Sequence, residues 1–534
     1  MLMRRATFAI TALLVASLGF VSLPSPVRAA SALPGPNNIY VGVNVNDSEE
    51  SSCENPDFSL DDEYIQDALT LAFDDVNDDG DVIIICEGFY DYGESPDQID
   101  EYNGSAEGSH PVITIRAEEG AEVVLDGRDH NRQLLRFNNT DVTIAGIIFY
   151  KSGGSAISAM SGDGIHSLTV EDSAFYLGNA PNGSAIYAEN MDLTVTGSIF
   201  GAAEDDAATP NYAEGPGISS YSGGAIFATG LDLPRAARIS ISDSTFTANT
   251  AEAGNGGAIM VEFETRLIVS GSTFTANSAE ELFGMPSSYG CGGAIYLRNE
   301  FGAQITNTMF TENSADYTGG AIASQSSPET CAGDPAVYAR SLLEIRSSTF
   351  RENTAVCAGG AIESLALRVS SSLFEANTAG SCAGGAIAAP GVVRGTPFEL
   401  LNNRFIDNVL DAPEGTSCCD GGAVYLTYDD ESGAGGTPLI KGNSFLRNSS
   451  DQYGGALNLR GSMSVRGISR NTLQGNTAVR GGGISLTQNC DAQPASRRVA
   501  SDLLRANRFR ANRADSRREA DLFRSPEGHC GPGG

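Results

Sequence analysis

The segment DGRDHNR, which begins at Asp126, holds the densest group of residues suited to acid–base chemistry in the chain. Asp129 and His130 provide a carboxylate and an imidazole that exchange protons near neutral pH, while Asp126 and Arg128 add charges of both signs. A polar turn with a local ion pair between two early strands explains the same residues. We therefore assign no catalytic residue and keep Asp126, Arg128, Asp129 and His130 as candidates.

A second segment has the residue types of a calcium loop. Asp75, Asn77 and Asp79, followed by Gly80, spell D-x-N-x-D-G, which places oxygen ligands at alternate positions before a sharp turn. The position that should carry a bidentate Glu holds Cys86, however, and a strand pattern follows where a helix is required. A turn into a strand explains the segment as well, so Ca²⁺ is the one cofactor that the sequence leaves open.

Most of the chain consists of a repeat that must position any such site. Apolar residues fall five and seven residues before a recurring Phe, as Leu267 and Val269 do before Phe274, and this alternation indicates a strand. Units of about 24 to 40 residues bury an apolar face only by stacking on their neighbours. Twelve copies align on Phe149, Phe175, Phe200, Phe246, Phe274, Phe310, Phe350, Phe374, Phe405, Phe445, Leu473 and Phe509.

Two further elements recur within each copy. Gly-Gly-Ala-Ile or a variant, with Gly256, Gly257, Gly359 and Gly360 as examples, predicts a tight corner before another short strand. An Asn three residues after the Phe position suits a left-handed turn or a stack of hydrogen-bonded amides. This Asn is Asn249, Asn277, Asn313, Asn353, Asn377, Asn408, Asn448, Asn476 and Asn512.

These features predict an all-β fold, a right-handed parallel β-helix with an N-terminal capping helix. Coils spaced by about 4.8 Å would build a rod of roughly 60 Å. Residues 37–135 should form the cap and first coils, with an amphipathic helix in SLDDEYIQDALTLAFDDV, and residues 136–512 the repeat rod. Residues 513–534 are then a C-terminal tail.

Ten cysteines in an exported chain favour disulfides over a metal site. Cys53 and Cys86 flank the expected helix and should pair. Cys357 and Cys382 each lie two residues before a Gly-Gly, so stacking would bring them within disulfide distance. Further candidate pairs are Cys490 with Cys530 and Cys291 with Cys331, although sequence alone does not fix the connectivity.

The N-terminus has the pattern of a secretory signal. Arg4 and Arg5 precede an apolar run, and the small residues of VRAASA offer a cleavage site after Ala29, so residues 1–29 should be removed. No second apolar run of membrane length follows. We expect a monomer that is secreted or held at the cell surface or outer membrane, with no transmembrane segment after cleavage.

The charge distribution limits the partners. A net charge of −34 disfavours nucleic acid, because phosphates would be repelled. Arginines nevertheless crowd the end of the chain, in SRRVASDLLRANRFRANRADSRREADLFR. This run is typical of a solvated cap, and the alternative is docking onto an acidic surface.

The alternation of Gly-Gly-Ala-Ile with Phe-x-x-Asn over about residues 223–512 resembles the polymorphic outer membrane protein repeat. The N-terminal pattern GD-x-I-x-x-C-x-G-x-Y, at residues 80–90, resembles the opening of pectin-lyase-like β-helix proteins. The first resemblance implies an extracellular or outer-surface protein, often adhesive. The second implies a polysaccharide lyase or hydrolase.

The residues needed for polysaccharide cleavage are sparse. The chain has only two lysines, Lys151 and Lys441, and four histidines, and His166 lies in the weaker segment GDGIHS. We also find no column of Asp stacked with Arg between neighbouring coils. We therefore expect an adhesive or structural rod that binds a surface, glycan or protein partner through its loops and faces. A lyase or hydrolase acting on acidic polysaccharide is the alternative.

Overall fold

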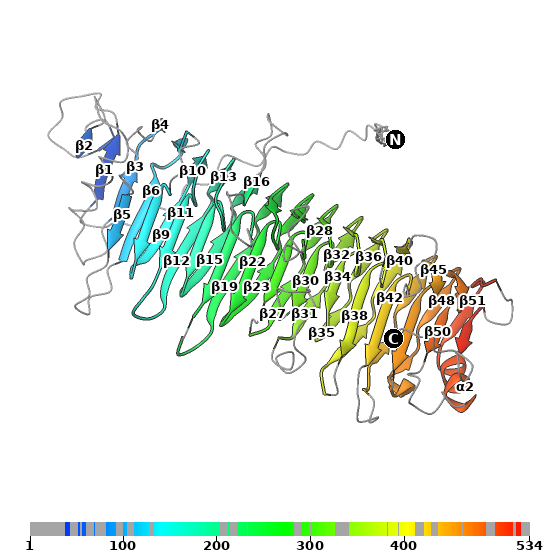
Figure 1. Ribbon diagram of the computed structural model, residues 1–534. Coiled ribbons are helices and arrows are strands. Elements are labelled where there is room, and N and C mark those ends of the chain that lie inside the picture. The colour runs from blue at the N-terminus through cyan, green and yellow to red at the C-terminus, as the bar shows by residue number, and fades with distance from the viewer. Residues whose placement is uncertain are drawn as a thin grey trace, which may run out of the picture.

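The computed structural model shows one rod built from stacked coils (Figure 1). It describes residues 38–42, 52–53, 56–59, 69, 82–91, 100–103, 112–128, 133–201, 212–213, 222–231, 233–281, 290–298, 301–325, 341–381, 383–392, 395–411, 421–428, 436–461, 463–487, 497–515 and 520–524.

Four parallel sheets run along the rod. They contain 15, 14, 14 and nine strands, and every described strand pair is parallel. One coil contributes β23 (Thr265–Ser270), β24 (Thr273–Thr275), β25 (Ser278–Glu280) and β26 (Ile295–Arg298), one strand to each sheet. The predicted parallel β-helix is therefore present.

A column of stacked phenylalanines fills the core. The sheet that contains β24 runs from β4 (Gly88–Asp91) to β51 (Arg508–Arg510), and we call it the Phe sheet. Its ten rings from Phe149 to Phe445 stack with neighbouring centroids 4.6–4.9 Å apart. Strand register extends the column to Tyr90 at the N-terminal end and to Phe509 at the C-terminal end.

The Asn three residues after each Phe forms a buried ladder. In eight consecutive steps from Asn249 to Asn512, Nδ2 donates to Oδ1 of the next Asn at 2.8–3.0 Å. The backbone N–H donates to the same oxygen, and Nδ2 also donates to the carbonyl of an earlier Phe. The sequence suggested either a left-handed turn or a stack of hydrogen-bonded amides for this Asn, and the amide stack is confirmed.

The residue before each ladder Asn adopts the left-handed backbone conformation that the sequence had suggested for the Asn itself. Ala248, Ala276, Ala376 and their equivalents have φ between 52° and 57°, and Gly475 is the one glycine among these positions. The left-handed conformation costs an L-residue roughly 1–2 kcal/mol. The corner is therefore held in place by the ladder that follows it.

A second ladder lies two residues before each Phe and was not predicted. From Ser173 to Ser372 each Ser hydroxyl at this position accepts a backbone N–H of the preceding coil at 3.2–3.4 Å and donates to a carbonyl two residues earlier. Thr308 holds the position in one coil, and its hydroxyl donates to the carbonyl of Thr306. From Asn403 onward the position is Asn, and the amides bond from coil to coil as in the first ladder. Two polar ladders therefore flank the Phe column.

The Gly-Gly pair forms the corner before the next strand of each coil, and its two glycines are required for different reasons. Gly256 has φ +69°, as the sequence predicted. Gly257 is excluded from bearing a side chain, because a Cβ there would lie 2.2 Å from the carbonyl oxygen of Gly293 in the next coil. One glycine supplies a backbone conformation and the other allows close approach of two backbones.

Helices are found at the C-terminal end of the described chain. Helix α2 (Arg497–Ala506) places Leu503 against the core, and the 3₁₀ turn η1 (Val465–Gly467) lies nearby. Strand β52 (Leu522–Arg524) pairs with β50 (Ile484–Thr487), which extends the rod beyond residue 512. Of the expected N-terminal helix only Leu69 is described, and it is helical and buried.

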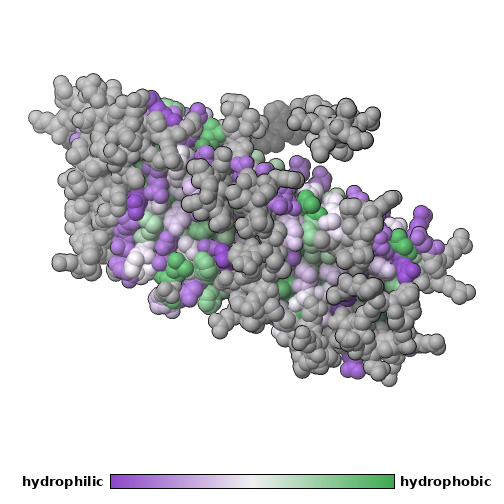
Figure 2. Space-filling view, in the orientation of Figure 1, coloured by the Kyte–Doolittle hydropathy of each residue, from purple (hydrophilic) through white to green (hydrophobic). Residues whose placement is uncertain are grey.

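No described helix has the length and apolarity needed to cross a membrane. The visible face of the rod mixes hydrophilic and hydrophobic residues (Figure 2).

A disulfide joins Cys53 to Cys86, the expected pair, with their Cα atoms 5.4 Å apart. Cys291 and Cys357 are also disulfide-bonded, to partners outside the described residues. A β-bridge between Ala358 and Ala383 places the residues that follow Cys357 and Cys382 in adjacent coils. Cys331, Cys382, Cys490 and Cys530 lie outside the described part of the chain.

We predict that Asn353→Ala destabilises the protein by on the order of 3 kcal/mol. The change leaves the N–H groups of Asn313 and the carbonyl of Phe310 without their buried partner. The measurement is urea unfolding followed by circular dichroism. Thr354→Ala, on the exposed side of the next position, is the control and should change stability by less than about 0.5 kcal/mol. Equal effects of the two changes would show that the ladder is not specifically stabilising.

We predict that Ala376→Gly leaves stability unchanged or raises it by up to about 1 kcal/mol. Relief of the left-handed strain, roughly 1–2 kcal/mol, outweighs the greater flexibility of unfolded glycine, roughly 0.5–1 kcal/mol. Ala379→Gly is the matched control, because Ala379 is buried and has no positive φ, and it should be destabilising. A clear loss of stability in Ala376→Gly would contradict the assigned conformation.

Candidate functional site

The acid–base candidates in DGRDHNR form a structured turn as far as they are described. The backbone N–H of Arg128 donates to Oδ1 of Asp126 at 2.8 Å, and the Arg128 guanidinium pairs with Asp91 in the preceding coil. Asp126 is buried, and Arg128 has φ +53°. Asp129 and His130 lie outside the described residues. The described half of the cluster therefore stabilises a turn between two coils.

The calcium candidates Asp75, Asn77 and Asp79 also lie outside the described residues. In the described part of the chain, one group of potential metal ligands lies close together, formed by Cys53, Cys86 and Glu118. Its two sulfurs are bonded to each other, so they are not available as thiolate ligands. Ca²⁺ therefore stays a prediction from the sequence.

His166 is buried between two carboxylates, an arrangement that the segment GDGIHS did not reveal. Its Nε2 lies 3.0 Å from Oδ1 of Asp163, and its Nδ1 lies 3.8 Å from Oδ1 of Asp141. Burial works against ionisation of Asp163, but hydrogen bonds from His166 and Ser161 hold its pKa below the ordinary value. Asp141 also accepts two hydrogen bonds from Ser167, so the cluster is locked into the coil.

Acidic residues do stack with arginines between coils, and the opposite expectation was wrong. Arg447 pairs with Asp407 and Arg351 pairs with Glu375, each in register across neighbouring strands or corners. Besides the Arg128–Asp91 pair, the other described arginine pairs between coils are Arg235 with Asp192, Arg298 with Glu262, and Arg368 with Glu344 and Glu399. They are mostly exposed, so each contributes little to stability.

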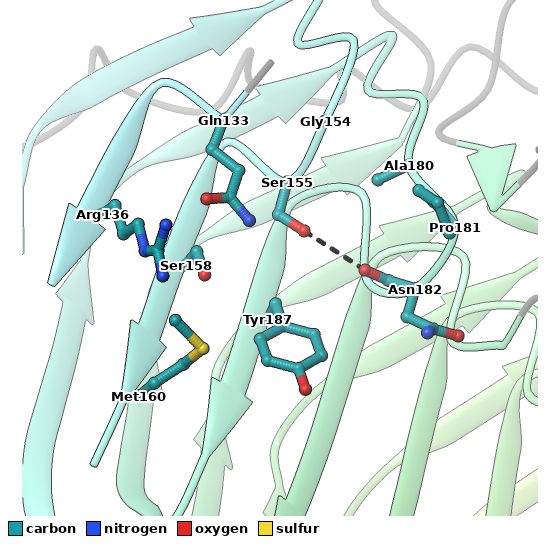
Figure 3. Close-up of a pocket in the computed structure, with 10 residues that line it drawn as sticks. All are labelled: Gln133, Arg136, Gly154, Ser155, Ser158, Met160, Ala180, Pro181, Asn182 and Tyr187. Carbon is teal, nitrogen blue, oxygen red and sulfur yellow. Dashed lines mark hydrogen bonds between the residues drawn. The ribbon is translucent and has the colours of Figure 1, made fainter. Parts of the chain in front are cut away.

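A groove of about 540 Å³ lies on the outer face of the sheet that contains β26. It spans β8 (Leu135–Asn138), β11 (Ile157–Met160) and β14 (Ile186–Glu189), which pair in register (Figure 3). Leu135, Ile157 and Ile186 point into the core, so the next residues point outward. The groove is lined by Gln133, Arg136, Gly154, Ser155, Ser158, Met160, Ala180, Pro181, Asn182 and Tyr187.

Arg136, Ser158 and Tyr187 form one outward row across the groove (Figure 3). Arg136 is half-buried, and strand register places Glu101 of β5 (Asp100–Asn103) beside it. Ser158 is fully buried, and among the described residues its hydroxyl has no hydrogen-bond partner. A buried hydroxyl without a partner requires an explanation, and an ordered water supplies one.

Tyr187 is the last residue of this row and contributes an uncharged aromatic ring to the groove. Its ring stacks on Phe227 at 5.5 Å between centroids, and its hydroxyl donates to Oε2 of Glu189 at 2.8 Å. Burial first, and then the hydrogen bond to Glu189, raise the pKa of Tyr187 well above 10. The phenol therefore stays protonated at physiological pH and is not suited to act as a base.

The lining of the groove offers binding chemistry. The ten lining residues include no Asp, Glu, His or Lys, while a cation, an aromatic ring, amides and hydroxyls face the same space. These groups match a carboxylate-bearing sugar, whose charge pairs with a guanidinium and whose ring packs on an aromatic face. Sequence reasoning missed this site because its residues occupy outward positions that carry no repeated residue type.

Comparison with known proteins finds a sequence similarity within the repeat region. The family model described as the Chlamydia polymorphic membrane protein repeat matches residues 243–262, which contain one Phe-x-x-Asn and one Gly-Gly-Ala-Ile. No curated protein matches the sequence. A solved structure of a mannuronic acid specific polysaccharide family 6 lyase from human gut microbiota aligns with 87% of this chain and 90% of its own, at 11% identity and a TM-score of 0.30. Residues 243–262 of the parallel β-helix are therefore similar to the Chlamydia polymorphic membrane protein repeat.

Proposed function

We propose that this protein is an exported, surface-associated β-helical rod that binds an acidic glycan in the groove over β8, β11 and β14 without cleaving it. The row of Arg136, Ser158 and Tyr187 is the observation that carries the proposal. The signal-like N-terminus and the membrane-protein repeat support a surface location.

Arg136 gives the groove its preference for an acidic sugar. The protein as a whole has a net charge of −34 and repels polyanions at long range, so recognition depends on a local cation. A guanidinium can bind a carboxylate with two parallel hydrogen bonds, and partial burial strengthens them.

The groove favours binding over cleavage because no lining residue is suited to take a proton. Burial and the hydrogen bond to Glu189 keep Tyr187 protonated, and the guanidinium of Arg136 offers hydrogen-bond donors only. The Asp126–Arg128 turn lies on a different sheet from the groove, in the strand and turn of β7 (Val123–Asp126). A cleavage mechanism would therefore need groups from outside the described lining.

We predict that Arg136→Gln weakens binding of oligomannuronate or oligogalacturonate by about tenfold or more, because a charge-assisted hydrogen bond is lost. Isothermal titration calorimetry on the purified mature chain measures this affinity, with a neutral oligosaccharide as ligand control. Arg266→Gln removes the same charge from an exposed position in the middle of the rod and should leave the affinity unchanged.

The same samples test the alternative function. New reducing ends or unsaturated products that disappear in Arg136→Gln would make the groove the site of a lyase or hydrolase. Equal affinities of the Arg136 and Arg266 variants, or no binding of any acidic oligosaccharide by the intact rod, would contradict the proposal.

A further inference from the structure

The C-terminal end of the rod carries a group of exposed arginines that the proposed function does not use. Among the described side chains of residues 460–524, seven arginines are exposed, against two exposed acidic residues, Asp502 and Asp515. We call the seven arginines the basic collar, and they are Arg460, Arg466, Arg470, Arg505, Arg508, Arg510 and Arg513. The protein as a whole has a net charge of −34, so the collar is a local reversal of charge.

The basic collar lies on several sides of the rod within its last three coils. β46 (Leu457–Gly461) carries Arg460 on the sheet that continues through β50 to β52. η1 carries Arg466 close to α2, and β51 carries Arg508 and Arg510 on the Phe sheet. Because coils are about 4.8 Å apart, the seven arginines fall within about 10 Å along the axis, at the end where α2 lies (Figure 1).

Two exposed apolar side chains lie in the same coils. Leu504 of α2 is 44% exposed and precedes Arg505, and Val479 in β49 (Thr477–Arg480) is 39% exposed. Leu503 is buried in the core, so α2 is fixed to the rod while it presents Leu504 to solvent. Arginines interspersed with apolar side chains suit the interface of an anionic membrane, where headgroups attract the cations and the acyl region accepts the apolar groups.

We propose that the basic collar docks the C-terminal end of the rod, end-on, onto the anionic lipid headgroups of a membrane surface. The guanidinium groups bind headgroup phosphates with paired hydrogen bonds, and Leu504 enters the interface beside them. The inference rests on the proposed function for the surface location of the rod, and it requires nothing from the groove.

The charge distribution favours an end-on contact over a side-on contact. A side-on contact would bring only part of the collar to the lipid and would hold the acidic shaft against a surface of like charge. An end-on contact brings the whole collar to within about one Debye length of the surface, which is about 8 Å at physiological ionic strength. The acidic coils beyond that distance are screened from the membrane.

The same arrangement favours a membrane over a linear polyanion. A strand of nucleic acid or glycan follows a basic stripe or groove along one face of a protein. The arginines of the collar are instead distributed around the end of the rod, where a plane reaches more of them than a strand does.

An end-on contact holds the groove over β8, β11 and β14 clear of the membrane. In the sheet that contains the groove, nine strand steps separate β14 from β50, and at about 4.8 Å a step they span roughly 43 Å. This distance is about five Debye lengths, so the negative potential of the membrane does not reach an acidic glycan in the groove.

The test is co-sedimentation of the purified mature chain with vesicles of phosphatidylcholine, alone or with about one-third phosphatidylglycerol. The wild type should bind the anionic vesicles at about 0.1 M NaCl, bind them about tenfold less at about 0.5 M, and leave the neutral vesicles unbound. Arg508→Gln combined with Arg510→Gln should weaken binding about 25-fold, because each arginine near an anionic surface contributes about fivefold. Leu504→Ser should weaken it about threefold or more without any change in charge.

Arg238→Gln combined with Arg266→Gln is the matched control, because these two arginines are exposed and paired in register in the middle of the rod. This control should bind the vesicles like the wild type. The Arg508 and Arg510 variant should keep the glycan affinity of the wild type in calorimetry, so failure of the membrane contact and failure of the groove are separate results.

Four outcomes would overturn the proposal. They are no binding of the wild type to anionic vesicles, equal binding to neutral vesicles, an equal loss in the Arg238 and Arg266 control, and full binding by Leu504→Ser. Displacement of the bound wild type by inorganic phosphate at constant ionic strength would also contradict it, and would assign the collar to a soluble phosphate ligand.

Discussion

Hydrogen bonding between identical side chains in successive coils is the interaction on which the rest of the structure depends. The Asn ladder is wholly buried, and each amide is satisfied by the coils on both sides of it. In a low-dielectric interior such a network fixes one register, because any slip leaves several polar groups without partners. The Phe column alone would tolerate small slips, since stacking is weakly directional.

That fixed register explains the strained corners. Residues such as Glu352, Asp407 and Arg447 occupy the left-handed region immediately before a ladder residue, where glycine would be the easier choice. The hydrogen bonds of the Asn ladder stabilise these corner residues in the left-handed conformation. Glycine is therefore not required at the corner, and other residue types occupy it. The corner then gains side chains, and two of these, Asp407 and Arg447, form an ion pair between coils.

The sequence predicts those features in which one residue type recurs at one position. Phe, Gly-Gly and Asn are of this kind, and the parallel β-helix follows from them. The ladder two residues before each Phe is not predictable from a repeated residue type, because Ser, Thr and Asn all occupy the position. The structure shows that these side chains hydrogen-bond from coil to coil in the same column. The groove escaped notice for a related reason, since Arg136, Ser158 and Tyr187 are joined by register across three coils rather than by a motif.

Ladder geometry is independent of the number of residues between its members. Successive amides are separated by 24 residues between Asn353 and Asn377 and by 40 between Asn313 and Asn353, yet both Nδ2–Oδ1 distances are 2.9 Å. Each coil therefore presents the same upper and lower surface to its neighbours, whatever length of chain it carries outside the core. Unequal recombination can add, remove or exchange whole coils without creating a new interface, so a gene of this kind can diversify its exterior rapidly while inheriting a ready-made interior.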